Sequence, residues 1–176
     1  RFGQLADGTP YDLIFVFDTI GYNFEPSEMG AAYGVVQLHK LDEFNARRSD
    51  NWQCLHDHVT ASEPPGVAQG VTTPGARTTW MRFCFTVPAD GPMSRNDVQA
   101  FLENRGVSTR MVWTGNILRQ PGFARIAHRQ PETGLPNCDH LMDHALSLPI
   151  HHRLYPEHMD YICQQLDALF AEMQGS

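Results

Sequence analysis

The sequence predicts an α+β fold in which helices cover a small antiparallel sheet. One observation is the alternation of side chains over residues 79–87, which is typical of a strand with one apolar face. A second is the order strand, helix, strand, loop, helix, strand, helix from residue 77 onward. The third is a final helix over 156–173 whose apolar residues recur at helical spacing: Met159, Ile162, Leu166, Leu169 and Phe170.

The first third of the chain is predicted to contain a turn-rich stretch followed by two helices. Residues 1–26 are rich in turn-forming and aromatic residues, with a short strand over 13–17. A helix is expected to begin near Ser27, and the small residues in its body lead us to expect that it is buried. A longer helix over 41–59 follows, with one face formed by Leu41, Phe44, Arg48, Trp52 and Leu55.

Turn and capping residues mark the remaining elements. Residues 60–77 contain Pro-Pro-Gly and Pro-Gly turns and are expected to form a linker or an exposed loop. Ser94 and Asp97 have the spacing of a capping box, so a helix should start there and end near 105. We expect strands at 107–113 and 146–151, a helix at 136–145, and a loop at 114–134. A loop of this length is uncommon in a compact domain unless it is functional.

The composition restricts the classes of partner. The 176 residues are 41% hydrophobic and 19% charged, as in ordinary folded domains. The net charge of −7 disfavours nucleic acid as a partner. Twelve arginines stand against the single lysine, Lys40; arginine suits small anions such as phosphate, although genome composition alone would also produce this bias.

The sequence contains no targeting or membrane signal. No stretch reaches 18 apolar residues and no signal-peptide pattern opens the chain, so we expect a cytoplasmic protein without a membrane partner. The chain begins with Arg1 rather than Met, which we interpret as a partial chain. Four cysteines without metal-knuckle spacing are expected to be buried free thiols: Cys54, Cys84, Cys138 and Cys163.

Histidines offer the best candidate for a metal site within the chain. His140 and His144 are four residues apart on a predicted helix, so they share a face and could bind zinc with a third ligand. Leu141 stands where the metalloprotease motif has a glutamate. A surface or interface role is therefore favoured, and no metal is predicted. The sequence also lacks a flanked Ser or Cys nucleophile, a P-loop and a dinucleotide fingerprint.

Several motifs together resemble a known family. Residues 20–24 read Ile-Gly-Tyr-Asn-Phe, residues 28–32 read Glu-Met-Gly-Ala-Ala, and residues 37–41 read Gln-Leu-His-Lys-Leu. This pattern is similar to a signature of the DegT/DnrJ/EryC1/StrS sugar aminotransferases. Thr109-Arg110 and the run Gly-Asn-Ile-Leu-Arg-Gln-Pro-Gly-Phe over 115–123 resemble the nucleotide-4-keto-6-deoxyhexose 3-dehydratases within it.

The resemblance implies the C-terminal part of a fold type I enzyme that uses pyridoxal phosphate or pyridoxamine phosphate. Residues 1–55 would then be the end of the large cofactor domain with interdomain helices, and residues 56–176 the small α+β domain. The family's catalytic Lys or His would lie upstream, so no catalytic residue is predicted in this chain. Several dehydratases place a His just before the Ile-Gly-Tyr-Asn motif, where this chain has Asp18-Thr19.

The resemblance also implies cofactor-binding and substrate-binding residues. Tyr22 and Asn23 would contact the cofactor, with the Asn23 amide reaching its phosphate in the neighbouring subunit of a homodimer. The alternative for Asn23 is a turn residue that bonds its own backbone. Four residues are predicted to bind a nucleotide-sugar substrate: Arg110, Asn116, Arg119 and Gln120. For these the alternatives are a surface arginine and a loop held by its own side-chain bonds.

Three functions follow from this interpretation. The first is part of a C3 dehydratase of a nucleotide 4-keto-6-deoxyhexose, in deoxysugar or polysaccharide biosynthesis. The second is part of a nucleotide-sugar aminotransferase on the same fold. The third, of a different class, is a truncated interaction module without catalysis. An upstream His, an upstream Lys, or a true start near Arg1 would distinguish the three.

Overall fold

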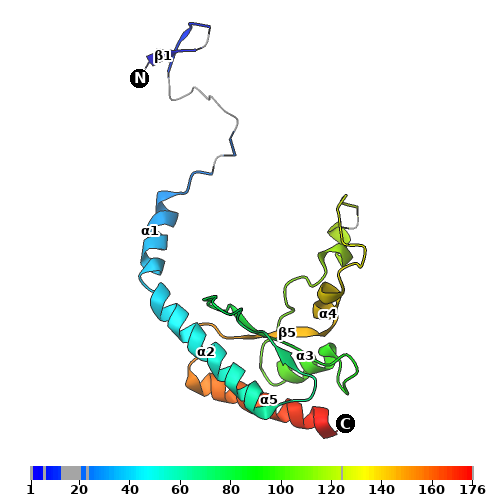
Figure 1. The fold of residues 1–176 in the computed structure, drawn as a ribbon. Helices are drawn as coiled ribbons and strands as arrows, with labels where there is room; N and C mark the ends of the chain where they lie inside the picture. The colour runs from blue at the N-terminus through cyan, green and yellow to red at the C-terminus, as the bar shows by residue number, and fades with distance from the viewer. Residues whose placement is uncertain (1, 6, 13–20, 23, 124, 176) are drawn as a thin grey trace. The chain divides into compact units, whose positions relative to one another are not determined.

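The computed structural model describes residues 2–5, 7–12, 21–22, 24–123 and 125–175 (Figure 1). The chain divides into two compact units, Arg1–His39 and Lys40–Ser176. The first unit contains β1 (Phe2–Gln4), β2 (Pro10–Asp12) and α1 (Glu28–Leu38). The second contains α2 (Leu41–Ser62), β3 (Ala68–Gln69), β4 (Arg82–Thr86), α3 (Arg95–Glu103), the 3₁₀ turns η2 (Ile117–Arg119) and η3 (Pro121–Phe123), α4 (Pro136–His144), β5 (Ala145–Pro149) and α5 (Pro156–Gly175).

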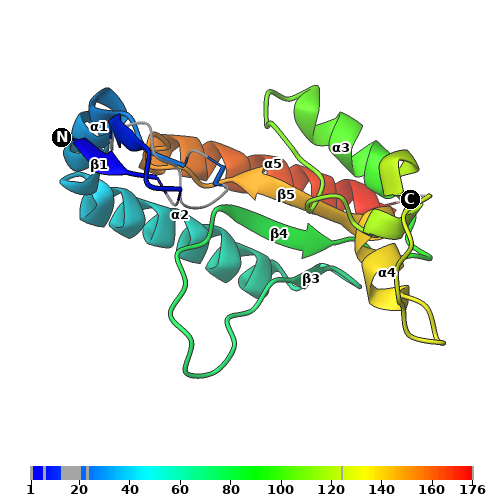
Figure 2. The same cartoon turned by 90° about the horizontal axis from the view of Figure 1, so that it is seen from above.

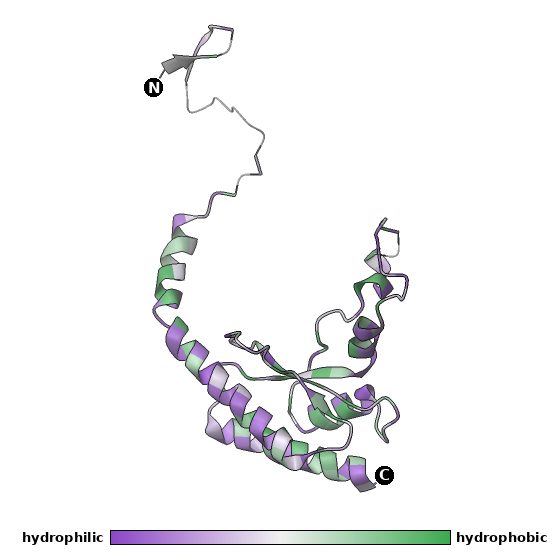
Figure 3. Ribbon diagram, in the orientation of Figure 1, coloured by the Kyte–Doolittle hydropathy of each residue, from purple (hydrophilic) through white to green (hydrophobic). Residues whose placement is uncertain are grey.

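The described residues of the first unit form an antiparallel pair, β1 with β2, and the helix α1. The helix begins where the sequence predicts, because the Ser27 side chain accepts a hydrogen bond from the Gly30 backbone N–H at 3.1 Å. The strand predicted at 13–17 lies outside the described residues. The expectation that α1 is buried is wrong within this chain, since none of its residues is buried. Small residues permit close approach, but they do not themselves supply a covering element. Figure 3 shows mostly apolar residues along this helix.

The second unit contains the predicted antiparallel sheet, in the order β3-β4-β5 (Figures 1 and 2). In the register of the central pair, Phe83 lies opposite Leu148 and Phe85 opposite Leu146. These four side chains are buried, and they form the apolar face of the sheet. The α+β prediction is therefore confirmed.

Two predictions for this sheet are wrong in detail. The strand expected at 107–113 forms only one bridge, between Arg110 and Ser147. The segment leaves the sheet edge at Trp113, whose φ of 53° is left-handed and incompatible with an extended strand. The stretch predicted as linker or loop contains the short strand β3, which pairs with β4 at two positions only. Two residues are too few to produce a recognisable alternation.

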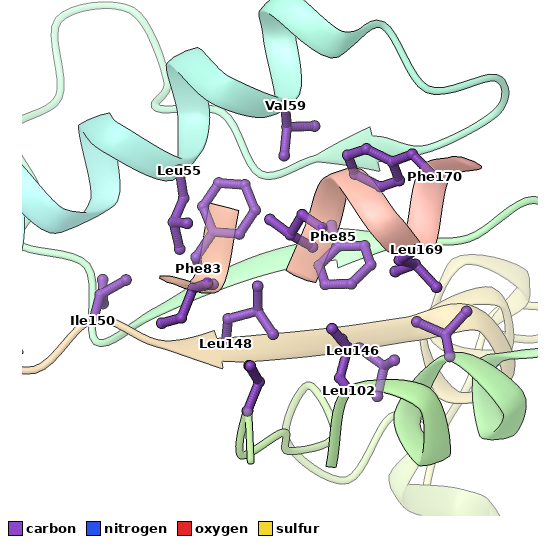
Figure 4. Packing of buried hydrophobic residues seen from close by; sticks show 14 of the residues in the cluster. Leu55, Val59, Phe83, Phe85, Leu102, Leu146, Leu148, Ile150, Leu169 and Phe170 are labelled. Atoms are coloured by element: carbon purple, nitrogen blue, oxygen red, sulfur yellow. The ribbon is translucent and has the colours of Figure 1, made fainter. Parts of the chain in front are cut away.

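The core of the second unit lies between the sheet and its helices. Leu55 and Val59 of α2 and Leu169 and Phe170 of α5 pack with β4 and β5 (Figure 4). Val98 and Leu102 extend the cluster from α3. The five residues predicted to face inward from the last helix are all buried, because period-3.6 patterning is a strong signal over a helix of 20 residues.

One buried side-chain amide on α2 bonds to the segment between β5 and α5. The Asn51 side chain donates from Nδ2 to the backbone oxygens of Ile150 at 3.5 Å, His151 at 3.2 Å and Leu154 at 3.1 Å. The predicted division after residue 55 falls inside this helix and stays a prediction. The buried residues Asn51, Leu55 and Val59 lie on both sides of it and share one face.

Candidate functional site

The long loop after the sheet edge borders a cleft with a volume of about 300 Å³. The loop contributes Trp113, Gly115, Arg119 and Gln120, while α3 contributes Arg95 and α4 contributes residues 141–143. Among its described residues, this loop contains the two 3₁₀ turns η2 and η3 and no α-helix or strand. The sequence therefore located the loop correctly, and the structure places two of the four predicted substrate residues, Arg119 and Gln120, in one cleft.

Arg119 is tied to α4 by two carboxylates. Its Nη1 atom lies 3.2 Å from Oδ1 of Asp139 and 3.1 Å from Oδ2 of Asp143. The hydrogen bond from Arg119 is the main reason that the pKa of Asp143 lies below its usual value, and the charges of His144 and Arg95 act in the same direction. About half of the Arg119 side chain stays exposed, at 47%. The guanidinium can therefore meet a ligand from solvent while the aspartates orient it.

Asn116 and Gln120 are engaged with the loop itself. Asn116 is only 6% exposed; its Nδ2 donates to Asp139 at 2.9 Å and its Oδ1 accepts from the Leu118 backbone at 3.0 Å. Gln120 donates from Nε2 to the backbone oxygen of Thr114 at 3.1 Å. These bonds shape the loop, as in the alternative that the sequence left open. A role in binding sugar hydroxyls would need the remaining lone pairs and N–H groups.

Arg110 lies on the sheet beside a second arginine, and it does not line the cleft. Its backbone pairs with Ser147, and its Nη1 donates to the backbone oxygen of Thr109 at 2.9 Å. The neighbouring Arg82 donates from Nε to the Ser147 hydroxyl at 2.7 Å. Burial and the charge of Arg110 together lower the pKa of Arg82. Two close guanidinium groups favour an anion, so Arg110 with Arg82 forms a separate basic group on the sheet.

The cofactor residues predicted in the first unit are described only in part. The Tyr22 ring is 86% exposed and stacks on Phe24 with 5.6 Å between centroids, while Asn23 lies outside the described residues. Residues 21–38 contain no Lys, Arg or His, so this stretch offers a phosphate only neutral donors. A doubly charged phosphate needs more than this donor set, so these residues alone do not fit the whole cofactor.

The structure also locates the remaining titratable candidates. His140 and His144 lie with ring centroids 4.9 Å apart. Among the described residues, no three His, Cys, Asp or Glu side chains are grouped as metal ligands. The four cysteines are free thiols of intermediate burial, and burial followed by the neighbouring Cys54 raises the pKa of Cys163 to about 12. None of the helices in the described part of the chain is both long and apolar enough to span a bilayer.

Two side chains of the cleft with chemistry of their own, Trp113 and Arg95, are not among the predicted site residues. Trp113 is 87% exposed with a left-handed backbone, and Arg95 lines the cleft from the first turn of α3. The sequence predicts a strand that ends at Trp113, because nothing in the residue pattern indicates a positive φ at this tryptophan. Arg95 lies between the two residues of the capping box, Ser94 and Asp97. The residue pattern there indicates only the start of a helix and gives no sign of a binding residue.

Comparison with known proteins decides the family. The profile of the DegT/DnrJ/EryC1/StrS aminotransferase family matches residues 7–167. The chain belongs to this family. Its mixed α+β architecture matches part of the fold type I enzymes that use pyridoxal phosphate.

Three relatives illustrate what members of the DegT/DnrJ/EryC1/StrS family do. The dTDP-4-dehydro-2,6-dideoxy-D-glucose 3-dehydratase of Saccharopolyspora spinosa is 29% identical over 170 residues, which are 97% of this chain and 36% of that protein. The dTDP-3-amino-3,4,6-trideoxy-alpha-D-glucose transaminase of Streptomyces venezuelae is 30% identical over 134 residues, 76% of this chain and 33% of that protein. The structure of E. coli GDP-4-keto-6-deoxy-D-mannose-3-dehydratase with bound hydrated PLP has a TM-score of 0.77 at 25% identity, covering 87% of this chain and 38% of that one.

The chain thus matches between 33% and 38% of the length of these relatives. It is related to nucleotide-sugar dehydratases and aminotransferases that use pyridoxal phosphate.

Proposed function

We propose that this chain is the C-terminal portion of a nucleotide-4-keto-6-deoxyhexose 3-dehydratase, acting in the cytoplasm in deoxysugar or polysaccharide biosynthesis. The supporting observation is the cleft beside the 115–123 loop, where Arg119 is held half-exposed and oriented by two aspartates. A guanidinium in this state can bind a sugar-nucleotide oxygen by a charge-assisted bond. The similarity to a 3-dehydratase over 97% of the chain agrees with this assignment.

In this proposal the chain contributes binding groups and no catalytic residue. Arg119 and Gln120 bind the nucleotide sugar directly from the cleft. Asn116 positions them through its bonds to Asp139 and to the loop backbone, and Arg110 adds positive charge at the sheet. The complete enzyme binds pyridoxal or pyridoxamine phosphate, which supplies an electron sink for loss of a hydroxyl. Tyr22 and Asn23 contact that cofactor across a homodimer, within a larger donor set.

A nucleotide-sugar aminotransferase is the second candidate. The match to an aminotransferase family and the 30% identity to a transaminase favour it. Both reactions use a nucleotide sugar with a ketone, so the binding groups of this chain serve either one. The products differ, because dehydration removes the C3 hydroxyl whereas amino transfer replaces a carbonyl oxygen by nitrogen.

The experiment supplies a nucleotide 4-keto-6-deoxyhexose and pyridoxamine phosphate to the full-length enzyme that contains this chain, and analyses the product by mass spectrometry. A 3-deoxy product supports the dehydratase, and an amino sugar supports the aminotransferase. Arg119→Ala should raise KM or lower kcat by roughly 10–100-fold, the scale of a lost charge-assisted bond.

Two variants separate binding from loop structure. Asp143→Asn weakens the tether of Arg119 and keeps the guanidinium, so it should have a much smaller effect than Arg119→Ala. Arg129→Ala changes an exposed arginine outside the cleft residues and should leave the kinetics unchanged. Unchanged KM and kcat in a folded Arg119→Ala enzyme would remove Arg119 from the substrate site.

A further inference from the structure

The mouth of the cleft presents an indole ring that the fold leaves uncovered. Trp113 is 87% exposed, although tryptophan is normally among the residues that bury the most surface. Its φ of 53° is one of two positive values at non-glycine residues in the described part of the chain. Bulky L-residues rarely adopt this conformation, and strained residues cluster at ligand sites. The backbone strain and the open ring therefore point to an external partner.

The same cleft contains a guanidinium with unused donors. The Nε atom of Arg95 is buried, and no atom of the described residues accepts a hydrogen bond from it. One Nη atom contacts the sulfur of Met111, which is a weak acceptor. No carboxylate of the described residues lies within ion-pairing distance of Arg95, whereas Arg119 is bound to two. Arg95 is thus the cleft arginine whose guanidinium donors are left unsatisfied by the described residues.

We propose that Trp113 and Arg95 form a subsite for the nucleoside diphosphate part of the substrate, with the indole stacked on the base and Arg95 bound to a phosphate. This inference rests on the proposed function, and it names the portion of the nucleotide sugar that these two residues bind. A cleft of about 300 Å³ is at the lower limit of small-molecule sites, so it accommodates the phosphates while the base lies outside on the exposed ring. Stacking on an indole does not select one base, since every base has a π-face.

The test titrates the full 176-residue chain with dTDP by calorimetry, alongside GDP, thymidine and inorganic pyrophosphate. We expect saturable dTDP and GDP binding, and weaker binding of thymidine and pyrophosphate, each of which offers only half of the contacts. Trp113→Ala should weaken dTDP binding by about 5- to 150-fold, the scale of one base–aromatic stack. It should leave pyrophosphate binding unchanged.

Matched variants keep the two roles separate. Trp113→Phe retains a stacking face and should preserve most of the affinity for dTDP. Arg95→Gln should weaken dTDP and pyrophosphate but not thymidine. Tyr155→Ala removes another exposed aromatic, outside the cleft, and should change nothing. Thermal melting of each variant establishes that it is folded.

Three results would overturn the subsite. The first is the absence of saturable dTDP or GDP binding at millimolar concentrations. The second is equal dTDP affinity for the wild type and for folded Trp113→Ala. The third is pyrophosphate binding as tight as dTDP binding, which would make the cleft an anion site alone. A full-length enzyme that fails to dehydrate its sugar, while dTDP binding still depends on Trp113, would remove the proposed function and leave the subsite standing.

Discussion

Gly115 lies where the loop passes closest to α4. Its φ is 62°, and a Cβ atom built on it would lie 2.3 Å from Cβ and 2.6 Å from Cα of Met142. A residue with a side chain would be strained at this positive φ. The backbone of α4 would also have to move to make room for the added Cβ atom. This glycine therefore lets the loop that contains Asn116 and Arg119 approach the helix that contains Asp139.

Gly115→Ala should destabilise the chain by about 2–4 kcal/mol, through backbone strain and overlap with α4. Urea unfolding followed by circular dichroism measures this. Gly122→Ala is the control in the same loop, because its added Cβ would meet no atom within 4 Å. Equal unfolding midpoints for the two variants would contradict this prediction, because they would show that α4 moves to make room for the added methyl group.

Residue identity told more about the location of the site than about the role of each side chain. The Gly-Asn-x-x-Arg-Gln run located the cleft loop, because a long stretch without periodicity is itself a signal. It did not distinguish Asn116, which is buried and bonded to Asp139, from Arg119, which is half-exposed. Donor and acceptor chemistry is the same for a side chain that points inward or outward, and only the tertiary structure sets that direction.

Helix α3 shows how local bonds position one wall of the cleft. Ser94 accepts from the Asp97 backbone at 3.3 Å, and Asp97 accepts from the Ser94 backbone at 2.9 Å, which completes the predicted capping box. Arg95 directly follows the cap, so the cap fixes where its side chain leaves the backbone. The hydrogen bonds from Ser94 also lower the pKa of Asp97.

Ser94→Ala should lower the free energy of unfolding by about 1 kcal/mol, since it exposes an unpaired backbone N–H at the start of α3. Chemical denaturation of the purified chain gives this value. Ser49→Ala, at an exposed position inside α2, tests the same change where alanine favours the helix, and it should be neutral or slightly stabilising. A similar loss in both variants would contradict the capping argument.

Elements were predictable in proportion to their length and patterning. Helices α2, α3 and α5 and strand β4 were predictable because each buries one face at a regular period. The two-residue β3 and the single bridge at Arg110 have no period to detect. The burial of α1 within this chain was predicted wrongly, because small and apolar residues do not themselves supply a covering element.

At the scale of the whole molecule, the uncovered surface of α1 is the main evidence for a partner. Met29 is 84% exposed, Tyr33 68% and Val36 50%, and Met29 and Val36 are seven residues apart on one face. We propose that a second copy covers this helix in a homodimer, as the small residues between 21 and 41 would permit. The assembled enzyme would then bring Asn23 of one subunit to the cofactor of the other.

Met29→Glu combined with Val36→Glu should convert the dimer to a monomer, because two carboxylates would be buried without partners. Light scattering measures the mass of the wild type and of the variant. Met81→Glu changes a residue that is 76% exposed in the second unit, and it should leave the mass unchanged. A wild-type chain that is monomeric at all concentrations would exclude this interface.

Asn23→Ala should weaken cofactor retention in the full-length dimer without dissociating it.

The contacts of Asn51 have a consequence for biosynthesis. This residue on α2 bonds to carbonyls about a hundred positions later, and α5 supplies five buried residues to the same core. A ribosome releases the chain in order, so α2, β4 and β5 must wait for α5 before they can complete that core. During this interval the apolar face with Phe83, Phe85 and Leu148 lacks the part of its cover that α5 supplies. Nascent chains stalled before α5 emerges should therefore be the species that chaperones bind and proteases degrade.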